Sequence, residues 1–156
     1  MTNYATLVHP QAMLVMSNHL TRIKYDSINV QLPVHVGILL GQARGSHIEV
    51  NSALEILVTG EKGNLQVSQQ FLEHAYKDLH QPTYINEVLI GWYTCGKLDD
   101  TLRNEVGPKI EQLFSNYDSE VLLVGEFDYD VKNPPAEGKS PLTLYFNNNS
   151  VLVPID

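Results

Sequence analysis

The chain begins with a repeating pattern of apolar positions that predicts a helix. Between Pro10 and Tyr25, the pattern recurs at spacings of three and four, at Ala12, Val15, Met16, His19, Leu20 and Ile23. This spacing places these side chains on one face of a helix, and polar residues fall on the opposite face. Pro10 suits the first turn of that helix. We expect a short strand over residues 5–8 to precede it.

The helical period occurs twice more along the chain. After Ser68, a suitable N-cap residue, one face carries Phe71, Leu72, Ala75, Tyr76 and Leu79. After Asp99 or Asp100, a third pattern carries Leu102, Val106, Ile110, Leu113 and Phe114. Pro108 follows Gly107 in the middle of this third pattern, so we expect the helix to break or restart there.

Short apolar runs rich in Val, Ile and Leu lie between the helices and predict strands. The expected strands span residues 33–41, 46–58, 65–67, 87–93, 121–124, 142–146 and 151–153. We expect turns at residues 42–45 and 60–64, and a surface loop at residues 130–140, where proline and glycine are frequent. Helices among strands predict an α/β fold with a mixed central β-sheet flanked by helices, in a single domain over residues 1–156.

Charge and cysteine content narrow the class of protein. Eighteen acidic and ten scattered basic side chains give a net charge of −8, which argues against nucleic-acid or membrane-surface binding. The single cysteine, Cys95, excludes a disulfide framework and a cysteine-based zinc cage. The first residues lack the pattern of a signal peptide, and no apolar run is long enough to span a bilayer. We therefore expect a cytosolic or nuclear domain.

Residues 90–96, Ile-Gly-Trp-Tyr-Thr-Cys-Gly, lie where a predicted strand ends and a helix follows, a common place for catalytic groups. The segment offers a threonine and one cysteine. Cys95 precedes a helix N-terminus, which favours the thiolate a little, but Lys97 is the one basic residue beside it. An inert thiol is the favoured interpretation, and a cysteine nucleophile is the alternative.

The six histidines do not form the pattern of a metal site. His-x-His and His-x-x-x-His are both absent from the sequence. With a hairpin turn centred on Ala43 and Arg44, His47 would lie opposite Leu40, so His35 and His47 would not meet. A zinc site needs several such side chains at one point. The residues therefore predict no bound metal or other cofactor.

Four motifs in order along the chain resemble the MPN domain family. They are Val8-His9-Pro10, residues 36–41 (Val-Gly-Ile-Leu-Leu-Gly), Ile48-Glu49-Val50-x-Ser52, and residues 89–93 (Leu-Ile-Gly-Trp-Tyr). Together they cover most of the chain, from Leu7 to about Val124. The resemblance implies the MPN fold, which is of the cytidine-deaminase-like type.

Catalytic MPN domains are zinc isopeptidases, and the resemblance implies that this chain lacks their site. In those members two His and an Asp hold the Zn²⁺, while a Glu handles the proton of the zinc-bound water. The Glu, two His, Ser and Asp positions fall here on Val34, Thr94, Gly96, Asn104 and Gly107. A short deletion would bring Asp99 or Asp100 near the last position. The resemblance thus implies a non-catalytic member.

Non-catalytic MPN domains occur in the COP-nine signalosome, the proteasome lid and translation initiation factor three. Gly-Trp-Tyr-Thr-x-Gly and residues 51–57 are most similar to the signalosome member, subunit six. The resemblance implies a scaffold subunit that pairs with the catalytic MPN subunit and supports removal of a ubiquitin-like modifier from cullins. The alternatives are the lid, the initiation factor, or a residual enzyme that uses Cys95 or a rearranged metal site.

Helix surfaces are the expected contact with such a partner. The candidate residues are Met13, Met16, Phe71, Leu72 and Tyr76. The alternative for each residue is that it fills the core of its own domain. Longer family members continue into C-terminal helices, so we expect this chain, which stops at Asp156, to be an excised domain or a short member.

Overall fold

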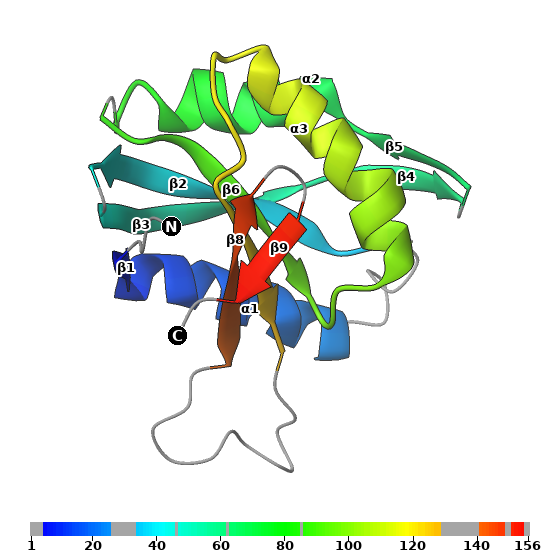
Figure 1. Ribbon diagram of the computed structural model, residues 1–156. Helices are drawn as coiled ribbons and strands as arrows, with labels where there is room; N and C mark the ends of the chain where they lie inside the picture. Colours follow the sequence, from blue (N-terminus) through cyan, green and yellow to red (C-terminus); the bar gives the residue numbers. More distant parts are fainter. Residues whose placement is uncertain are drawn as a thin grey trace.

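A mixed β-sheet forms the centre of the molecule (Figure 1). The computed structural model describes residues 5–25, 34–45, 47–61, 63–84, 86–128, 141–148 and 151–154. In this part of the chain, seven strands form one sheet in the order β1-β3-β2-β6-β7-β8-β9, and β4 pairs with β5 separately. The strands are β1 (Ala5–Val8), β2 (Val36–Arg44), β3 (His47–Ile56), β4 (Val58–Glu61), β5 (Asn64–Val67), β6 (Val88–Cys95), β7 (Leu123–Phe127), β8 (Leu142–Asn148) and β9 (Val151–Pro154).

Helices cover both faces of the large sheet (Figure 1). They are α1 (Pro10–Tyr25), α2 (Gln69–Leu72), η2 (Glu73–His80), η3 (Leu102–Val106) and α3 (Gly107–Ser115), of which η2 and η3 are π-helical. One apolar cluster joins Met16 of α1 to Leu39 and Tyr93, and a second joins Tyr76 and Phe114 to the other face. The β1–β3 and β6–β7 pairs are parallel and the others antiparallel, which confirms the predicted mixed sheet flanked by helices.

The first two helices form where the sequence predicts them. In α1, Ala12, Met16 and Leu20 are buried against the sheet. The second helix begins after Ser68, whose Oγ accepts a hydrogen bond of 3.1 Å from the backbone N–H of Phe71. This bond satisfies one of the N–H groups that a helix leaves without a partner in its first turn.

The third helix also begins as predicted, but it continues through Gly107 and Pro108. Asp99 is its cap, because its Oδ1 accepts a 2.9 Å hydrogen bond from the N–H of Leu102. The expected break or restart takes the form of a change of spacing: the N–H of Gly107 bonds the carbonyl of Leu102, five residues back, and the α-helical segment α3 begins at Gly107. A π-helical turn widens the helix where Pro108 offers no N–H, which explains why the chain need not break.

The predicted turn at residues 42–45 is wrong. β2 continues to Arg44, which lies opposite His47, so the hairpin turns at Gly45, where φ is +58°. Gly41 belongs to the strand because a Cβ there would lie 1.8 Å from the carbonyl oxygen of Glu49. The glycine that suggested an early turn is required instead by close packing of two strands. His35 and His47 still lie at opposite ends of the hairpin.

A small hairpin, β4–β5, replaces most of the turn predicted at residues 60–64. Its β5 strand is attached to the third helix by side chains rather than by another strand. Glu105 accepts hydrogen bonds from the N–H of Leu65 at 2.6 Å and of Gly63 at 3.0 Å, and Lys109 donates to the carbonyl of Leu65. The two charged side chains thus take the place of a neighbouring strand.

Replacing Glu105 by alanine is expected to lower the free energy of unfolding by about 1–2 kcal/mol, because two charge-assisted hydrogen bonds to a partly exposed carboxylate are lost. Urea denaturation measures the loss, and hydrogen exchange at the Leu65 amide locates it. Glu120→Ala, at an exposed carboxylate, is the control and should change stability by less than about 0.5 kcal/mol. Unchanged exchange at Leu65 in Glu105→Ala would contradict this role.

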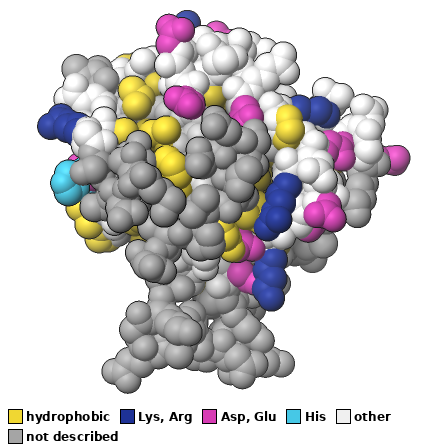
Figure 2. Space-filling model, in the orientation of Figure 1, with side chains coloured by type: hydrophobic (Ala, Val, Ile, Leu, Met, Phe, Trp, Pro, Cys, Tyr) yellow, Lys and Arg dark blue, Asp and Glu magenta, His cyan; other side chains and the backbone are white. Residues whose placement is uncertain are grey.

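The later strands are present with shifted ends. The strand predicted at 121–124 begins at Leu123, and the two C-terminal strands appear as β8 and β9. The loop predicted at residues 130–140 lies outside the described residues. No described helix is both long and apolar enough to cross a membrane. Among the side chains coloured by type in Figure 2, Lys and Arg do not gather into a broad basic patch.

Candidate functional site

The end of β6 lies between the start of β2 and the end of β7. Val36 is opposite Thr94, and Phe127 is opposite Cys95. The N–H of Cys95 donates a 2.9 Å hydrogen bond to the carbonyl of His35, and the N–H of Gly96 donates one of 3.0 Å to the carbonyl of Phe127. Main-chain hydrogen bonds therefore tie this strand end to both neighbours.

Thr94 and Gly96, the two positions at which zinc-binding histidines were expected in a catalytic member, differ in burial and backbone conformation. Thr94 is only 2% exposed, and its hydroxyl lies 3.5 Å from the carbonyl oxygen of His35. Gly96 adopts φ of +106°, a conformation that residues with side chains rarely adopt. The backbone at this position therefore favours glycine over any residue with a Cβ, histidine included.

The other three positions are distributed between the sheet and the third helix. Val34 precedes β2 and packs, half-buried, against the apolar cluster that contains Trp92. Asn104 is exposed on η3. Gly107 is buried, and a Cβ added there would lie 3.5 Å from the Trp92 ring. The structure thus brings Val34, Thr94 and Gly96 to one end of the sheet and leaves Asn104 facing solvent.

Glu126, which the sequence analysis did not single out, is a carboxylate beside this strand end. It lies opposite Thr94 on β7. Its Oε2 accepts a 2.7 Å hydrogen bond from the N–H of Leu98, and its Oε1 accepts one of 2.6 Å from the hydroxyl of Tyr145, whose pKa this bond raises. The carboxylate of Glu126 therefore links β7 to the segment that follows β6 and to β8. Among the described residues, no three His, Cys, Asp or Glu side chains are grouped so that they could hold a metal ion.

A polar network, buried at His19 and Tyr93 and partly exposed at Glu55 and Arg22, lies on the α1 face of the same strand. The Nδ1 of His19 is 2.9 Å from the hydroxyl of Tyr93, and its Nε2 is 3.5 Å from Oε1 of Glu55, which also pairs with Arg22. Gly37 makes room for the ring, because a Cβ there would lie 2.3 Å from Tyr93. Burial, and then the charge of Arg22, lower the pKa of His19 to about 4. The one sign of this network in the sequence was the position of His19 on the apolar face of the first predicted helix.

Comparison with known proteins identifies the family. The profile of the family described as JAB1/Mov34/MPN/PAD-1 ubiquitin protease matches residues 2–120. The chain belongs to the MPN family. This confirms the resemblance that the four sequence motifs indicated.

Curated relatives of this MPN domain include subunits of two assemblies. The 26S proteasome regulatory subunit rpn-8 of Neurospora crassa is 30% identical over 150 residues, which is 94% of this chain. COP9 signalosome complex subunit 6 is 24% identical over 153 residues (93% of this chain) in Neurospora crassa and 28% identical over 89 residues (57%) in Dictyostelium discoideum. The alignments cover only 39%, 28% and 28% of these relatives, respectively.

Cys95 does not have the environment of a nucleophile in this MPN domain. Burial raises the pKa of its thiol to about 12, opposed by the charge of Arg22 and reinforced by that of Asp128. A nucleophilic cysteine needs the opposite shift, since the thiolate is the reactive form. The effect of burial therefore outweighs the small benefit expected from the following helix N-terminus.

The Cys95 thiol is expected to react with a disulfide reagent at pH 8 at least ~100-fold more slowly than glutathione, because a pKa near 12 leaves almost no thiolate. Absorbance of the released aromatic thiol measures the rate. Unfolding in urea should restore a rate close to that of glutathione. Fast reaction of the folded protein would show that Cys95 is activated.

The structure divides the five residues proposed for partner contact. Met16, Leu72 and Tyr76 are buried in the two apolar clusters, so the alternative that they fill the core holds for them. Met13 is half-buried and packs against the cluster under α1. Phe71 is 42% exposed on α2. A helical repeat does not by itself reveal which edge of an apolar face remains uncovered, and that explains the correction.

Proposed function

We propose that this MPN domain is a non-catalytic scaffold that pairs with a catalytic MPN subunit. The observation that carries the proposal is the backbone of Gly96, whose φ of +106° suits glycine at the position of the second zinc-binding imidazole. Thr94 occupies the first imidazole position, and no histidine follows His80 in the sequence. A catalytic zinc site needs three protein ligands, and one remaining carboxylate would not hold the ion. The domain would then use the fold of an isopeptidase to contact other subunits rather than to catalyse a reaction.

The assembly that we propose is the COP9 signalosome, in which pairing would support cullin deneddylation in the cytoplasm and nucleus. The Gly-Trp-Tyr-Thr-x-Gly motif and the relatives named subunit 6 favour it. The proteasome lid is the second candidate, because the rpn-8 relative is 30% identical over 94% of this chain. Translation initiation factor three is the third and rests on the family resemblance alone.

The surface that we propose for the catalytic partner is the exposed side of α2. Phe71 is 42% exposed there, while the other side of the same helix holds Leu72 in the core. Aromatic side chains, Phe included, are enriched at protein–protein interfaces relative to the rest of the surface. Leu14, 60% exposed on α1, lies on the opposite face of the sheet and provides a matched comparison.

Co-expression with the catalytic MPN subunits of the signalosome and of the lid tests the pairing. Size-exclusion chromatography should show co-elution with one of them, and Phe71→Glu should abolish it while Leu14→Glu leaves it unchanged. Co-purification from cells separates the three assemblies. If neither subunit co-elutes, or if Leu14→Glu is the variant that disrupts the complex, the proposed surface is wrong.

The absence of catalysis is tested separately. The purified chain should contain well below one equivalent of zinc and should cleave neither di-ubiquitin nor a neddylated cullin. A catalytic MPN domain assayed in parallel verifies the substrates. Stoichiometric zinc, or cleavage that Cys95→Ala abolishes, would overturn the proposal in favour of a residual enzyme.

A further inference from the structure

Beyond Gly41, no described strand pairs with β2 on its β6 side. β6 begins at Val88, which lies opposite Gly41, whereas β2 continues to Arg44 with β3 on its other side. Within the described residues, the stretch from Gln42 to Arg44 therefore has a strand neighbour on one side alone. Such an edge presents main-chain N–H and C=O groups with which another extended chain can pair.

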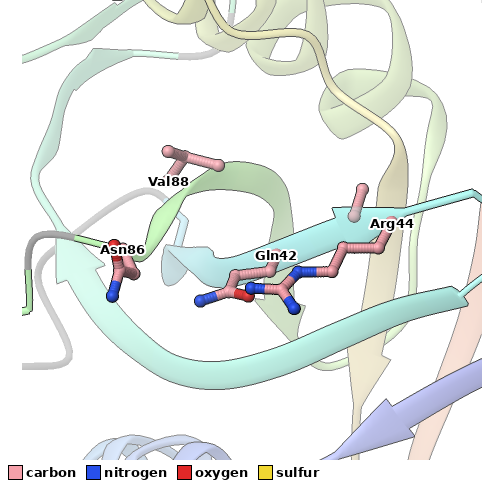
Figure 3. A pocket seen from close by; sticks show the side chains of 5 residues that line it. Gln42, Arg44, Asn86 and Val88 are labelled. Atoms are coloured by element: carbon pink, nitrogen blue, oxygen red, sulfur yellow. The ribbon is translucent and has the colours of Figure 1, made fainter.

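A pocket of about 260 Å³ lies along this edge (Figure 3). Its lining residues are Gln42, Ala43, Arg44, Asn86 and Val88. Figure 3 shows the polar ends of Gln42 and Arg44 side by side below β2, with the amide of Asn86 near them. Side-chain amides both donate and accept, so they suit the main chain of a peptide. Val88, 44% exposed, adds an apolar contact.

Arg44 gives the pocket its charge preference. Its guanidinium is exposed, and it has neither a hydrogen bond nor an ion pair with any described residue. The carboxylate of Glu49, which lies opposite Gln42 on β3, is paired with His9, and Arg22 on α1 is paired with Glu55. Because no described acidic side chain pairs with this guanidinium, it can bind a carboxylate from another molecule.

We propose that this pocket binds an extended acidic peptide segment of a partner protein. The peptide backbone pairs with the open edge of β2 beside Ala43, one carboxylate pairs with Arg44, and the amides of Gln42 and Asn86 bond its main chain. The site lies at the opposite end of β2 and β6 from Thr94 and on different elements from Phe71. It is therefore independent of the pairing proposed above.

Titration of the ¹⁵N-labelled chain with the blocked peptide Thr-Glu-Val-Glu-Val-Glu-Thr tests this site. The amide resonances of Ala43 and Val88 should shift in a saturable manner, and the same peptide with Lys in place of Glu should leave them unchanged. Arg44→Gln should weaken binding about three- to fivefold, the size expected for the loss of an exposed ion pair. Asn86→Asp, which places a negative charge beside the carboxylates of the peptide, should also weaken binding.

Arg103→Gln is the matched control, because Arg103 is exposed on η3 and its replacement removes the same charge away from the pocket. It should change the dissociation constant by less than about twofold. The proposal is overturned if the acidic peptide shifts no amide of the pocket. It is equally overturned if the Lys peptide binds as well, or if Arg103→Gln weakens binding as much as Arg44→Gln.

Discussion

Replacing Gly91 by alanine is expected to remove about 3–5 kcal/mol of the free energy of unfolding, or to prevent folding altogether. A Cβ at this position would lie 2.3 Å from the carbonyl oxygen of Leu123. β6 and β7 are each paired on both sides, so neither strand can move away without loss of ladder hydrogen bonds. Fluorescence of Trp92, the single tryptophan, which is 3% exposed, measures unfolding in urea.

Gly125→Ala is the matched control on the neighbouring strand. A Cβ there would lie 3.1 Å from a terminal methyl of Leu142 and 3.3 Å from one of Leu144, both of which can turn aside. Its cost should be about 1 kcal/mol or less. Equal costs at the two glycines would contradict the explanation. The glycine of Gly-Trp-Tyr is thus expected to serve the close approach of two backbones rather than chemistry.

Lowering the pH from 7 to 4 is expected to remove about 3 kcal/mol of stability through His19 alone. Burial, then the charges of Arg22 and His35, lower its pKa in the folded state from 6.5 to about 4. Between these values the unfolded chain binds more protons, so stability falls as the pH falls below 6.5. The loss is complete below about pH 4. Burial lowers the pKa of His35 too, which acts in the same direction.

His19→Asn tests this assignment because asparagine keeps a hydrogen-bond acceptor for the hydroxyl of Tyr93 and does not titrate. Urea denaturation at several pH values should show a shallower dependence between pH 6.5 and 4 in this variant. His74→Asn, at an exposed histidine on η2, should keep the full dependence. An unchanged pH profile in His19→Asn would assign the acid sensitivity to other groups.

Local patterns were sufficient to predict the helices. The apolar spacing of α1 and the caps of the other two helices depend on residues within a few positions of one another. The structure confirms the spacing and the cap at Ser68, and of the two candidate caps Asp99 and Asp100 it selects Asp99. The end of the β2 strand was not predictable in this way. Gly41 is required by its distance to Glu49 across the sheet, and no local pattern distinguishes that requirement from a turn.

Family motifs suggested which residues form the candidate site, whereas the environment of those residues comes from the structure. Family motifs pointed to Thr94 and Gly96, and the structure brings both to the strand end beside Val34. The role of Glu126, the partners of His19 and the high pKa of Cys95 all depend on contacts between residues far apart in sequence. Burial and charge in those contacts come from packing, which composition does not specify.

The sequence by itself determined the three helices, their apolar faces, the α/β class and the family motifs, because each depends on period, capping or residue identity. The tertiary structure alone decided which apolar side chains remain exposed, as Phe71 does and Leu72 does not. It also decided that Gly96 has a backbone suited to glycine and that β2 extends past β6 to Arg44. Those features depend on how strands and helices far apart in the chain come together, since burial and strand pairing are properties of the assembled sheet.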